Sequence, residues 1–316
     1  MSTRVCVVIA SWNGGQLLPD CLAALAAQTF RDFEVIVVDN GSVDGSVAWL
    51  AAHAPEVRVI CNAVNRGFAA ANNQGIAASR APLVVTLNND AVPEPAWLDA
   101  LVEAADRLEW AGMFASQIGL RDSGGRLDST GIEVDRAGVA WNRDWKKPGP
   151  DRAAEPIEVF GPSAAAALYR RAMLDQIGLF DEDLFAYYED VDLAWRAQWA
   201  GWRCAYVPQA VVEHAHSATS GQRSPFKSYY LGRNKWRVIA RNYPFETLRR
   251  FVPVMVLLDL VAMCGASWQS RSLGALRGRW AAWREWRQIQ RPPRDARSID
   301  WHQLLVPIRL SRFIAG

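Results

Sequence analysis

Apolar runs alternate with segments of helical spacing over the first 90 residues. Four runs have the unbroken apolar character of strands that are buried on both faces: Val5–Ala10, Phe33–Val38, Val57–Ile60 and Leu83–Leu87. The segments between them have helical spacing at Gln16–Ala27, through Trp49 to His53, and at Ala69–Ser79. Strands and helices that alternate at this pitch predict an α/β fold, with a mostly parallel sheet flanked by helices.

Polar residues follow the predicted strands, at the edge where open α/β sheets bind their ligands. The fourth strand ends in Asn88, Asn89 and Asp90, whose oxygens suit a hard divalent cation that bridges to phosphates, although Asn and Asp are also common in turns. The first loop lacks GxGxxG and the chain lacks GxxxxGK[ST], which disfavours a dinucleotide Rossmann site and a P-loop.

Two further residues of this half could contact a nucleotide. Asp39 follows the second strand, where it either accepts from a base N–H or a ribose hydroxyl, or caps the next helix. Asp44 fits the capping role better. Arg66 follows the third strand and either pairs with a diphosphate or remains a solvated surface residue.

The pattern changes after a predicted helix at Trp97–Trp110. Residues 111–160 are rich in Gly, and the short alternating runs Gly131–Val134 and Gly138–Trp141 predict a hairpin or a mixed sheet edge. The segment Gly161–Tyr169 is small and apolar, which lets a backbone or a ligand approach closely. We expect this half to bind an acceptor.

Acidic residues crowd the segment Phe180–Arg203. Glu189 and Asp190 stand at the predicted start of a helix, where the helix dipole favours anions. They either cap an amphipathic helix or supply a general base, because closely packed carboxylates have shifted pKa values. The next strand carries His214 and His216 on one face, either as metal ligands or as structural residues.

Composition and charge separate the chain into two parts. It has 316 residues, half of them hydrophobic, with a net charge of +2, which excludes a disordered protein. From Arg223 onward there are 18 Lys and Arg against 5 Asp and Glu, so the remaining body is acidic. The five scattered cysteines favour a reducing compartment, and no leader pattern precedes the first strand, so we expect a cytoplasmic body.

The basic C-terminal part has the pattern of an interfacial membrane anchor. Asp259 interrupts the apolar span Phe251–Ser270, at a cost of about 2.5–3.5 kcal/mol near mid-bilayer, which favours an interfacial or buried helix over a transmembrane one. Eight Arg and two acids lie between Arg271 and Arg297, interleaved with Trp. Nucleic acid and plain solubilising charge are the rival explanations.

Six motifs in order resemble the inverting family 2 glycosyltransferases of GT-A fold, particularly bacterial rhamnosyltransferase-like members. They span roughly residues 3–241 and read "VVIASWNGG", "VVDNGSVDGS", "NRGFAAANNQG", "LNNDAVPEPAWL", "FDEDLFAYYEDVDLAWR", and "HAHSATSG" followed by "RNKW". Each is weak alone, but six in one order are specific.

The resemblance implies a role for each matching residue. Asp190 would be the catalytic base with Glu189 as its neighbour, and Asp39 would read a pyrimidine base. Asn88, Asp90 and His214 would hold Mg²⁺ or Mn²⁺ against the donor diphosphate, although Asn88 replaces the first Asp of the family's DxD motif and removes one ligand charge. The donor site would comprise Ala10, Ser11, Asn13, Asp39, Ser42, Arg66, Gly67, Phe68, Asn73 and Asn89.

The resemblance also implies a domain plan and a reaction. Residues 1–222 would form the GT-A domain, with a nucleotide-sugar half (1–110) and an acceptor half (111–222), and residues 223–316 a helical, basic and aromatic membrane-associating extension. We expect sugar transfer from dTDP-rhamnose or a UDP-sugar to a lipid-linked or polysaccharide acceptor at the cytoplasmic membrane surface, with homodimer formation as a further expectation and no nucleic-acid partner. The alternative prediction is a non-catalytic sugar-nucleotide-binding or scaffold protein of a membrane glycan-assembly complex.

Overall fold

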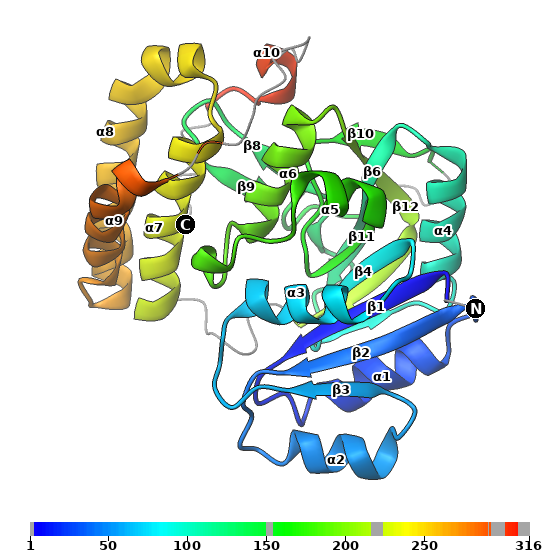
Figure 1. Ribbon diagram of the computed structural model, residues 1–316. Coiled ribbons are helices and arrows are strands. Elements are labelled where there is room, and N and C mark those ends of the chain that lie inside the picture. The colour runs from blue at the N-terminus through cyan, green and yellow to red at the C-terminus, as the bar shows by residue number, and fades with distance from the viewer. Residues whose placement is uncertain (1–2, 150–153, 216–223, 290, 292–300, 309–316) are drawn as a thin grey trace.

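The predicted strand–helix alternation of the first 90 residues is present in the computed structural model, which describes residues 3–149, 154–215, 224–289, 291 and 301–308 (Figure 1). Four parallel strands lie in the order β4-β1-β2-β3. Their bounds are β1 Val5–Ser11, β2 Phe33–Asp39, β3 Arg58–Cys61 and β4 Leu83–Asn88, and the helices between them are α1 Leu18–Ala26, α2 Ser46–His53 and α3 Phe68–Ala78.

The second half extends this sheet on the β4 side with mixed strand directions. β11 (Ala166–Arg170) is antiparallel to both β4 and β6 (Ala111–Leu120), and β6 is parallel to β12 (Arg203–His214). The sheet is therefore parallel in the first half, as predicted, and mixed as a whole. Short strands at its edges are β5 Ala91–Pro93, β7 Leu127–Ser129 and β10 Ile157–Val159, and the predicted hairpin forms from β8 Ile132–Val134 and β9 Ala140–Asn142.

Helices cover both faces of the sheet because side chains alternate along each strand. Val5 and Val7 of β1 point into a core with α1 and α4 (Trp97–Arg107), whereas Cys6 and Val8 point into the opposite core. The opposite core includes α3, α5 (Arg171–Ile177) and α6 (Glu189–Trp199). The carboxyl ends of β1 and β4 remain free of these layers, which leaves room for a site.

Three C-terminal helices form a layer beside the sheet, at the left of Figure 1. They are α7 Pro225–Asn242, α8 Phe245–Ser270 and α9 Gly274–Glu285. A short 3-10 helix, η2 Trp286–Gln288, and the short helix α10 Trp301–Leu304 follow them, and another 3-10 helix, η1 Glu182–Leu184, precedes α6. The ring of Trp301 packs on Trp195 and Trp199 of α6, so the chain returns to the main body. The predicted domain boundary between residues 222 and 223 falls within residues 216–223, which lie outside the described residues.

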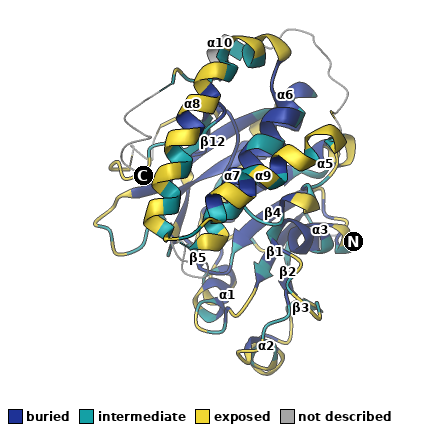
Figure 2. Cartoon of the chain, turned by 90° about the vertical axis from the view of Figure 1, so that its left-hand side faces the viewer, coloured by how far each residue is buried: buried dark blue, intermediate teal, exposed yellow. Residues whose placement is uncertain are grey.

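Asp259, on which the sequence-based choice of an interfacial or buried helix rested, is buried in the structure. Its carboxylate is buried inside the helix layer, 3.0 Å from Lys235 Nζ and 2.7 Å from Arg279 Nε, and it accepts a hydrogen bond from Trp236 Nε1. The cost expected from the sequence assumed a carboxylate that faces lipid, whereas this one faces two cations. By length and composition alone α8 could cross a membrane, and much of its surface is exposed (Figure 2).

Candidate active site

A cavity of about 690 Å³ opens at the carboxyl ends of β1 and β4, between the first half of the chain and the segments that lead into α6 and α7. Residues from both halves line it, which is the arrangement that a two-substrate site requires. Most of the predicted site residues are among them: Ala10, Ser11, Gly67, Phe68, Asn88, Asn89, Asp90, Glu189, Asp190 and His214.

The end of β4 and the end of β12 meet at His214. Its Nε2 lies 3.1 Å from Asn88 Nδ2 and 2.9 Å from Asp90 Oδ1, and both His214 and Asp90 are buried. The second contact has the distance of an ion pair but not the angles of a hydrogen bond, since Asp90 Oδ1 has no hydrogen-bond partner among the described residues. Asn89 donates to Ser11 Oγ at 3.2 Å, which ties the loop to β1. His216 lies outside the described residues.

Asp128 of β7 holds the other side of the His214 ring. Its Oδ2 lies 2.7 Å from His214 Nδ1, and its Oδ1 accepts a hydrogen bond from Asn142 Nδ2 at 2.9 Å. Burial alone would lower the pKa of His214, but the two carboxylates outweigh it and raise this pKa to about 9. The two carboxylates thus favour the protonated, positively charged form of the ring at neutral pH.

These residues fit a partial ligand set for Mg²⁺ or Mn²⁺. Among the described residues, no group of three or more His, Cys, Asp or Glu side chains is arranged to hold a metal alone. Asn88, Asp90 and His214 nevertheless bring an amide, a carboxylate and an imidazole to one point, and Asp90 keeps a buried oxygen without a hydrogen bond. Mg²⁺ typically takes one or two carboxylates from the protein and its other ligands from waters and substrate phosphates.

The two carboxylates at the start of α6 have different surroundings. Asp190 is partly exposed to the cavity and accepts hydrogen bonds from the backbone N–H groups of Ala164, at 3.3 Å, and Val191, at 2.8 Å. Glu189 is buried, and its Oε2 has no hydrogen-bond partner among the described residues. Burial raises the pKa of both groups, and the charge of Asp190 raises that of Glu189 further. The pair therefore loses its first proton from Asp190, whose ionised form the two N–H groups stabilise.

A left-handed loop delivers these carboxylates to the cavity. Phe185, Tyr187 and Tyr188 all have positive φ, at 62°, 68° and 70°, although none is glycine. The loop contacts the first half at Gly67, where an added Cβ would lie 2.6 Å from the Phe185 carbonyl oxygen and where φ is +87°. Gly67 is therefore required both for its backbone conformation and for this close approach.

Five predicted donor-site residues lie beside the cavity and do not line it. Asp39 is buried and accepts from the backbone N–H groups of Gly41 and Ser42 through Oδ2, while its Oδ1 has no hydrogen-bond partner among the described residues. The orphan oxygen suits a donor group of a ligand, such as a base N–H. Ser42 in turn accepts from the backbone N–H of Asn13 at 2.8 Å.

The other two have structural partners. Asn73 is buried, donates to the Phe180 carbonyl at 2.9 Å and accepts from the Phe180 N–H, so its amide joins α3 to the segment before α6. Arg66 lies 3.8 Å from Glu182, and both side chains are about half exposed. The pairing of Arg66 with a diphosphate stays a prediction, and its half-exposed side chain lies beside the cavity.

Sequence reasoning missed several residues that line the cavity. Asn40 and Trp12 follow Asp39 and Ser11 directly, so their places at the strand ends were a usable signal. Nothing in the local sequence distinguishes Asp128, because only the fold brings β7 to His214. The remaining missed residues include Asn65, Trp141, Asn142, Phe226 and Lys227.

Comparison with known proteins identifies the family. The family model described as Glycosyl transferase family 2 matches residues 6–178. The N-acetylglucosaminyl-diphospho-decaprenol L-rhamnosyltransferase of Mycobacterium tuberculosis is 34% identical over 242 residues, covering 69% of this chain and 78% of that protein. The O-antigen chain rhamnosyltransferase RfbN of Salmonella typhimurium is 25% identical over 239 residues, covering 72% and 70%.

Solved structures share the fold at lower identity. The mannosyltransferase PcManGT from Pyrobaculum calidifontis, in complex with GDP-Man and Mn²⁺, matches with a TM-score of 0.56 and 20% identity over 100% of this chain and 80% of that one. GalNAc-T7 with UDP, GalNAc and Mn²⁺ matches with a TM-score of 0.62 and 15% identity over 93% and 59%. The predicted GT-A type fold is thereby confirmed. Since the family model covers more than half of the chain, this protein belongs to glycosyl transferase family 2 and is a glycosyltransferase.

Proposed function

We propose that this glycosyltransferase moves L-rhamnose from dTDP-rhamnose to a hydroxyl of a lipid-linked glycan, with inversion at the anomeric carbon. The proposal rests on one observation: a short backbone segment connects Asp190 with the loop that contains Asn88 and Asp90. Ala164 donates its N–H to Asp190, and the next residue, Ala165, accepts from the N–H of Asn88 at 2.8 Å. Both groups thus line the same cavity.

Asp190 would take the proton of the acceptor hydroxyl. The reacting C1–O bond breaks with oxocarbenium-like character, and attack from the face opposite the leaving group inverts the centre, as in inverting glycoside hydrolysis. Asn88, Asp90 and His214 would hold Mg²⁺ or Mn²⁺, which when bound neutralises charge that develops on the leaving nucleoside diphosphate. Asp128 would fix the ring orientation of His214, as partners of metal-binding histidines commonly do.

Two relatives named as rhamnosyltransferases support rhamnose as the transferred sugar. The orphan oxygen of Asp39 supports a base with an N–H donor, which thymine and uracil both present. A UDP-sugar is therefore the alternative donor. The Mycobacterium tuberculosis relative is named for its acceptor, N-acetylglucosaminyl-diphospho-decaprenol, which supports a lipid-linked acceptor for this chain.

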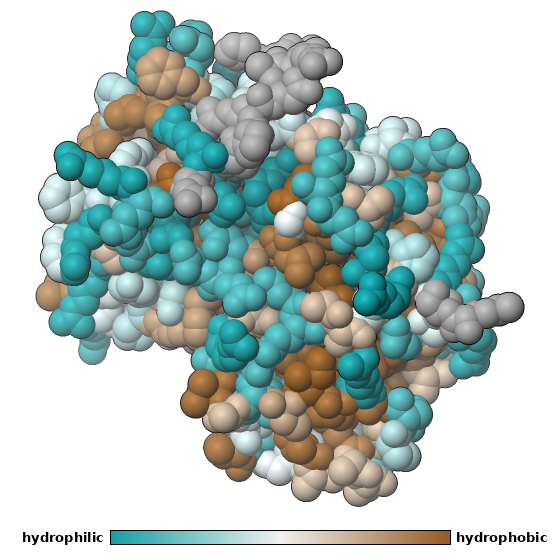
Figure 3. All heavy atoms as spheres, viewed as in Figure 1, coloured by the Kyte–Doolittle hydropathy of each residue, from teal (hydrophilic) through white to brown (hydrophobic). Residues whose placement is uncertain are grey.

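The exposed face of α8 supports peripheral attachment to a membrane. Between Phe251 and Ser270 the only charged residue is Asp259, and it is buried. Arginines stand at both ends of this stretch, which suits a helix that lies in the interface of an anionic membrane. Part of this surface is visible at the upper left of Figure 3, and its exposed residues include Val254, Val256, Leu257, Leu260, Val261 and Trp268.

Thermal unfolding tests the proposal against its rivals. The purified protein is heated with dTDP-rhamnose, UDP-hexoses or GDP-mannose, with Mg²⁺, Mn²⁺ or a chelator. A donor at a hundred times its Kd stabilises the fold by about 2.7 kcal/mol, so one donor should raise the Tm, and the chelator should remove the shift. A shift that survives the chelator would exclude the metal role. The absence of any shift, or a shift without sugar release in the presence of an acceptor, would favour the non-catalytic scaffold.

A further inference from the structure

The carboxylates of α6 follow a loop whose backbone conformation depends on its surroundings. Residues 185–188 contain three non-glycine residues in the left-handed region, which L-residues adopt only when their surroundings impose it. The segment ends at Tyr188, directly before Glu189 and Asp190. Four consecutive residues of this loop, Phe185 to Tyr188, also line the cavity. The contacts that hold this loop in place therefore also determine the position of Asp190.

Asn234 of α7 makes three of the contacts that hold this conformation, beside the N–H of Ala69, which donates to the Phe185 carbonyl at 3.2 Å. The Asn234 side chain is fully buried, and Nδ2 lies within hydrogen-bond distance of three loop carbonyls, those of Leu184 at 2.8 Å, Ala186 at 2.9 Å and Tyr187 at 2.8 Å. One amide group has two hydrogens, so the three carbonyls share them and converge on a single atom. Asn234 does not itself line the cavity, so it acts on the site through the loop.

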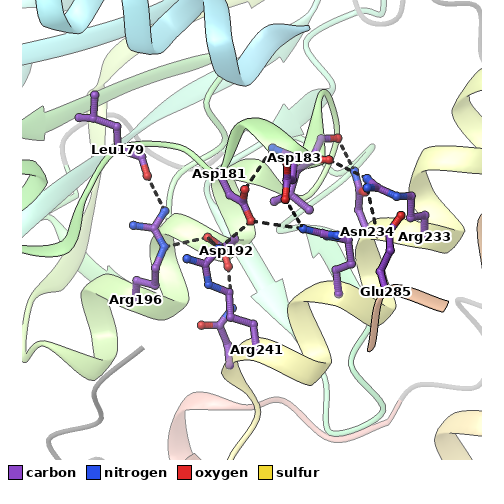
Figure 4. A network of polar contacts seen from close by, with 12 residues as sticks. Leu179, Asp181, Asp183, Asp192, Arg196, Arg233, Asn234, Arg241 and Glu285 are labelled. Atoms are coloured by element: carbon purple, nitrogen blue, oxygen red, sulfur yellow. Dashed lines mark hydrogen bonds and ion pairs between the residues drawn. The ribbon is translucent and has the colours of Figure 1, made fainter. Parts of the chain in front are cut away.

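Hydrogen bonds and an ion pair hold α7 against both ends of the same segment (Figure 4). Before the loop, Arg233 donates to the Asp183 carbonyl at 2.6 Å, and Arg241 pairs with Asp181 at 2.6 Å. After the loop, Asn242 donates to Asp192 of α6 at 2.7 Å. Asn234 thus lies at the centre of a continuous contact between α7 and residues 181–192.

Glu285 of α9 binds two arginines of α7 and so stabilises the same contact. Glu285 accepts from Arg233 at 3.0 Å and from Arg237, and Arg237 also pairs with Asp183 at 2.9 Å. Because α9 packs beside α8, these contacts connect the loop at residues 185–188 to the helix whose exposed face is apolar. The C-terminal helices are therefore part of the catalytic body as well as its periphery.

We propose that Asn234 is a positioning residue for catalysis: by gathering the carbonyls of residues 184, 186 and 187 it sets the loop that presents Asp190 to the acceptor. The inference rests on the proposed role of Asp190. It adds that a buried amide that does not line the cavity controls turnover. Donor binding, which depends mainly on the strand ends of the first half, should change much less.

The test measures turnover and donor affinity separately in Asn234→Ala. Release of nucleoside diphosphate is followed with whichever sugar nucleotide stabilises the parent protein most, and donor Kd is taken from thermal shifts. We expect kcat to fall at least about tenfold while Kd stays within about twofold. The control is Gln28→Ala, because Gln28 is also fully buried and donates to two carbonyls, those of Ala24 and Glu94, and none of these three residues lines the cavity. It should lower the Tm and keep the parental kcat.

Two results would overturn the inference. One is a parental kcat in Asn234→Ala despite a lowered Tm, and the other is an equal loss of kcat in Gln28→Ala. If Asn234→Ala does not fold, Asn234→Asp carries the test, since it keeps the size of the side chain and removes the N–H donors to the three carbonyls; parental kcat in that variant would also overturn the inference. A parental kcat in Asp190→Asn would instead contradict the proposed function, so the two failures are distinguishable.

Discussion

Asp190 accepts a hydrogen bond from the backbone N–H of Ala164, with 3.3 Å between Oδ2 and N. This bond links the start of α6 to the segment before β11, whose next residue bonds to Asn88. Proton removal and leaving-group stabilisation must act on one bound substrate pair, and small displacements of either group cost large factors in rate. The small residues of Gly161–Tyr169 thus matter because they let two parts of the site share one backbone segment.

Replacement of Asp190 by Asn should abolish detectable transfer. A positioned general base contributes about 10²- to 10⁴-fold, and an amide of the same shape cannot accept the proton. Donor affinity should stay nearly unchanged, because Asp190 lies on α6 and the cation loop on β4. Product formation and donor Kd are measured on the same preparation. A collapse of donor affinity would mean that Asp190 is a structural or metal-binding residue.

Glu189→Gln should retain most activity, within a few-fold of the parent. Burial and the neighbouring charge of Asp190 raise the pKa of Glu189 well above its usual range, so the side chain is protonated when Asp190 is ionised. Gln resembles that protonated form in shape and in the absence of charge. Loss of activity as large as in Asp190→Asn would show that Glu189 ionises during the reaction.

The acid limb of the pH profile should lie above the range of an ordinary aspartate. The base must be ionised to accept a proton, and burial raises the pKa of Asp190, so kcat/KM should fall as the pH drops through this raised value. An exposed Asp would lose activity only near its usual pKa of about 3.9. The profile is measured over the range in which the protein stays folded, with Glu189→Gln alongside. Because Glu189 is already protonated there, its replacement should leave the acid limb in place.

The strand ends of the first half were predictable because a parallel sheet brings consecutive carboxyl ends to one edge. The apolar run before Asn88 and the acidic run around Asp190 were long enough to be read as a strand and a helix start, and the structure has both elements there. The patterns alone did not decide whether Asp190 is a general base or a helix cap, and the family resemblance predicted the base.

Contacts between distant segments could not be predicted in this way. Asp128 reaches His214 across 86 positions, and Asp259 reaches Lys235 and Arg279 from the middle of an apolar run. In each case the local sequence gives no sign of the partner, because a strand pairing or a helix packing decides it. The sequence predicted an interfacial or buried helix around Asp259, but it gave no sign of the two cations that pair with this carboxylate.

Asn88→Asp should bind a divalent cation more tightly than the parent. It restores the ligand charge that the family's DxD motif has at this position, and the affinity of oxygen-ligand sites rises with the number of ligand charges. Binding of Mn²⁺ is titrated with and without a nucleoside diphosphate. Asp90→Asn is the opposite change and should weaken binding in both conditions. Equal Mn²⁺ affinity in all three proteins would exclude this loop as the cation site.

Asp259→Ala should destabilise the fold by about 3–5 kcal/mol, the usual cost of leaving a buried charge without its partner. Lys235 and Arg279 would keep their positions in the helix layer without a counter-charge. These cations hold the pKa of Asp259 below its usual range, so its contribution is present at neutral pH and is lost only as the pH falls through that lowered value. Chemical unfolding measures the change, and the paired variant Asp259→Leu with Lys235→Met should recover part of it.

A pair of charges on α8 should release the protein from membranes without disturbing the site. Leu257 and Val261 are 62% and 54% exposed and stand one helical turn apart, so Leu257→Asp with Val261→Asp places two carboxylates on the proposed lipid face. Co-sedimentation with vesicles of phosphatidylglycerol and phosphatidylcholine should fall at least about tenfold, because the change removes apolar contact and adds repulsion from anionic lipid.

Point variants test this surface better than deletion of residues 251–316, since a deletion would also remove Asp259 and Glu285, which support α7. Ile157→Asp is the matched control: Ile157 is 45% exposed on β10, at a sheet edge away from α8. It should sediment like the parent and release nucleoside diphosphate at the parental rate. Unchanged sedimentation of the α8 variant would refute attachment through this face, and equal loss in the Ile157 variant would indicate nonspecific charge repulsion.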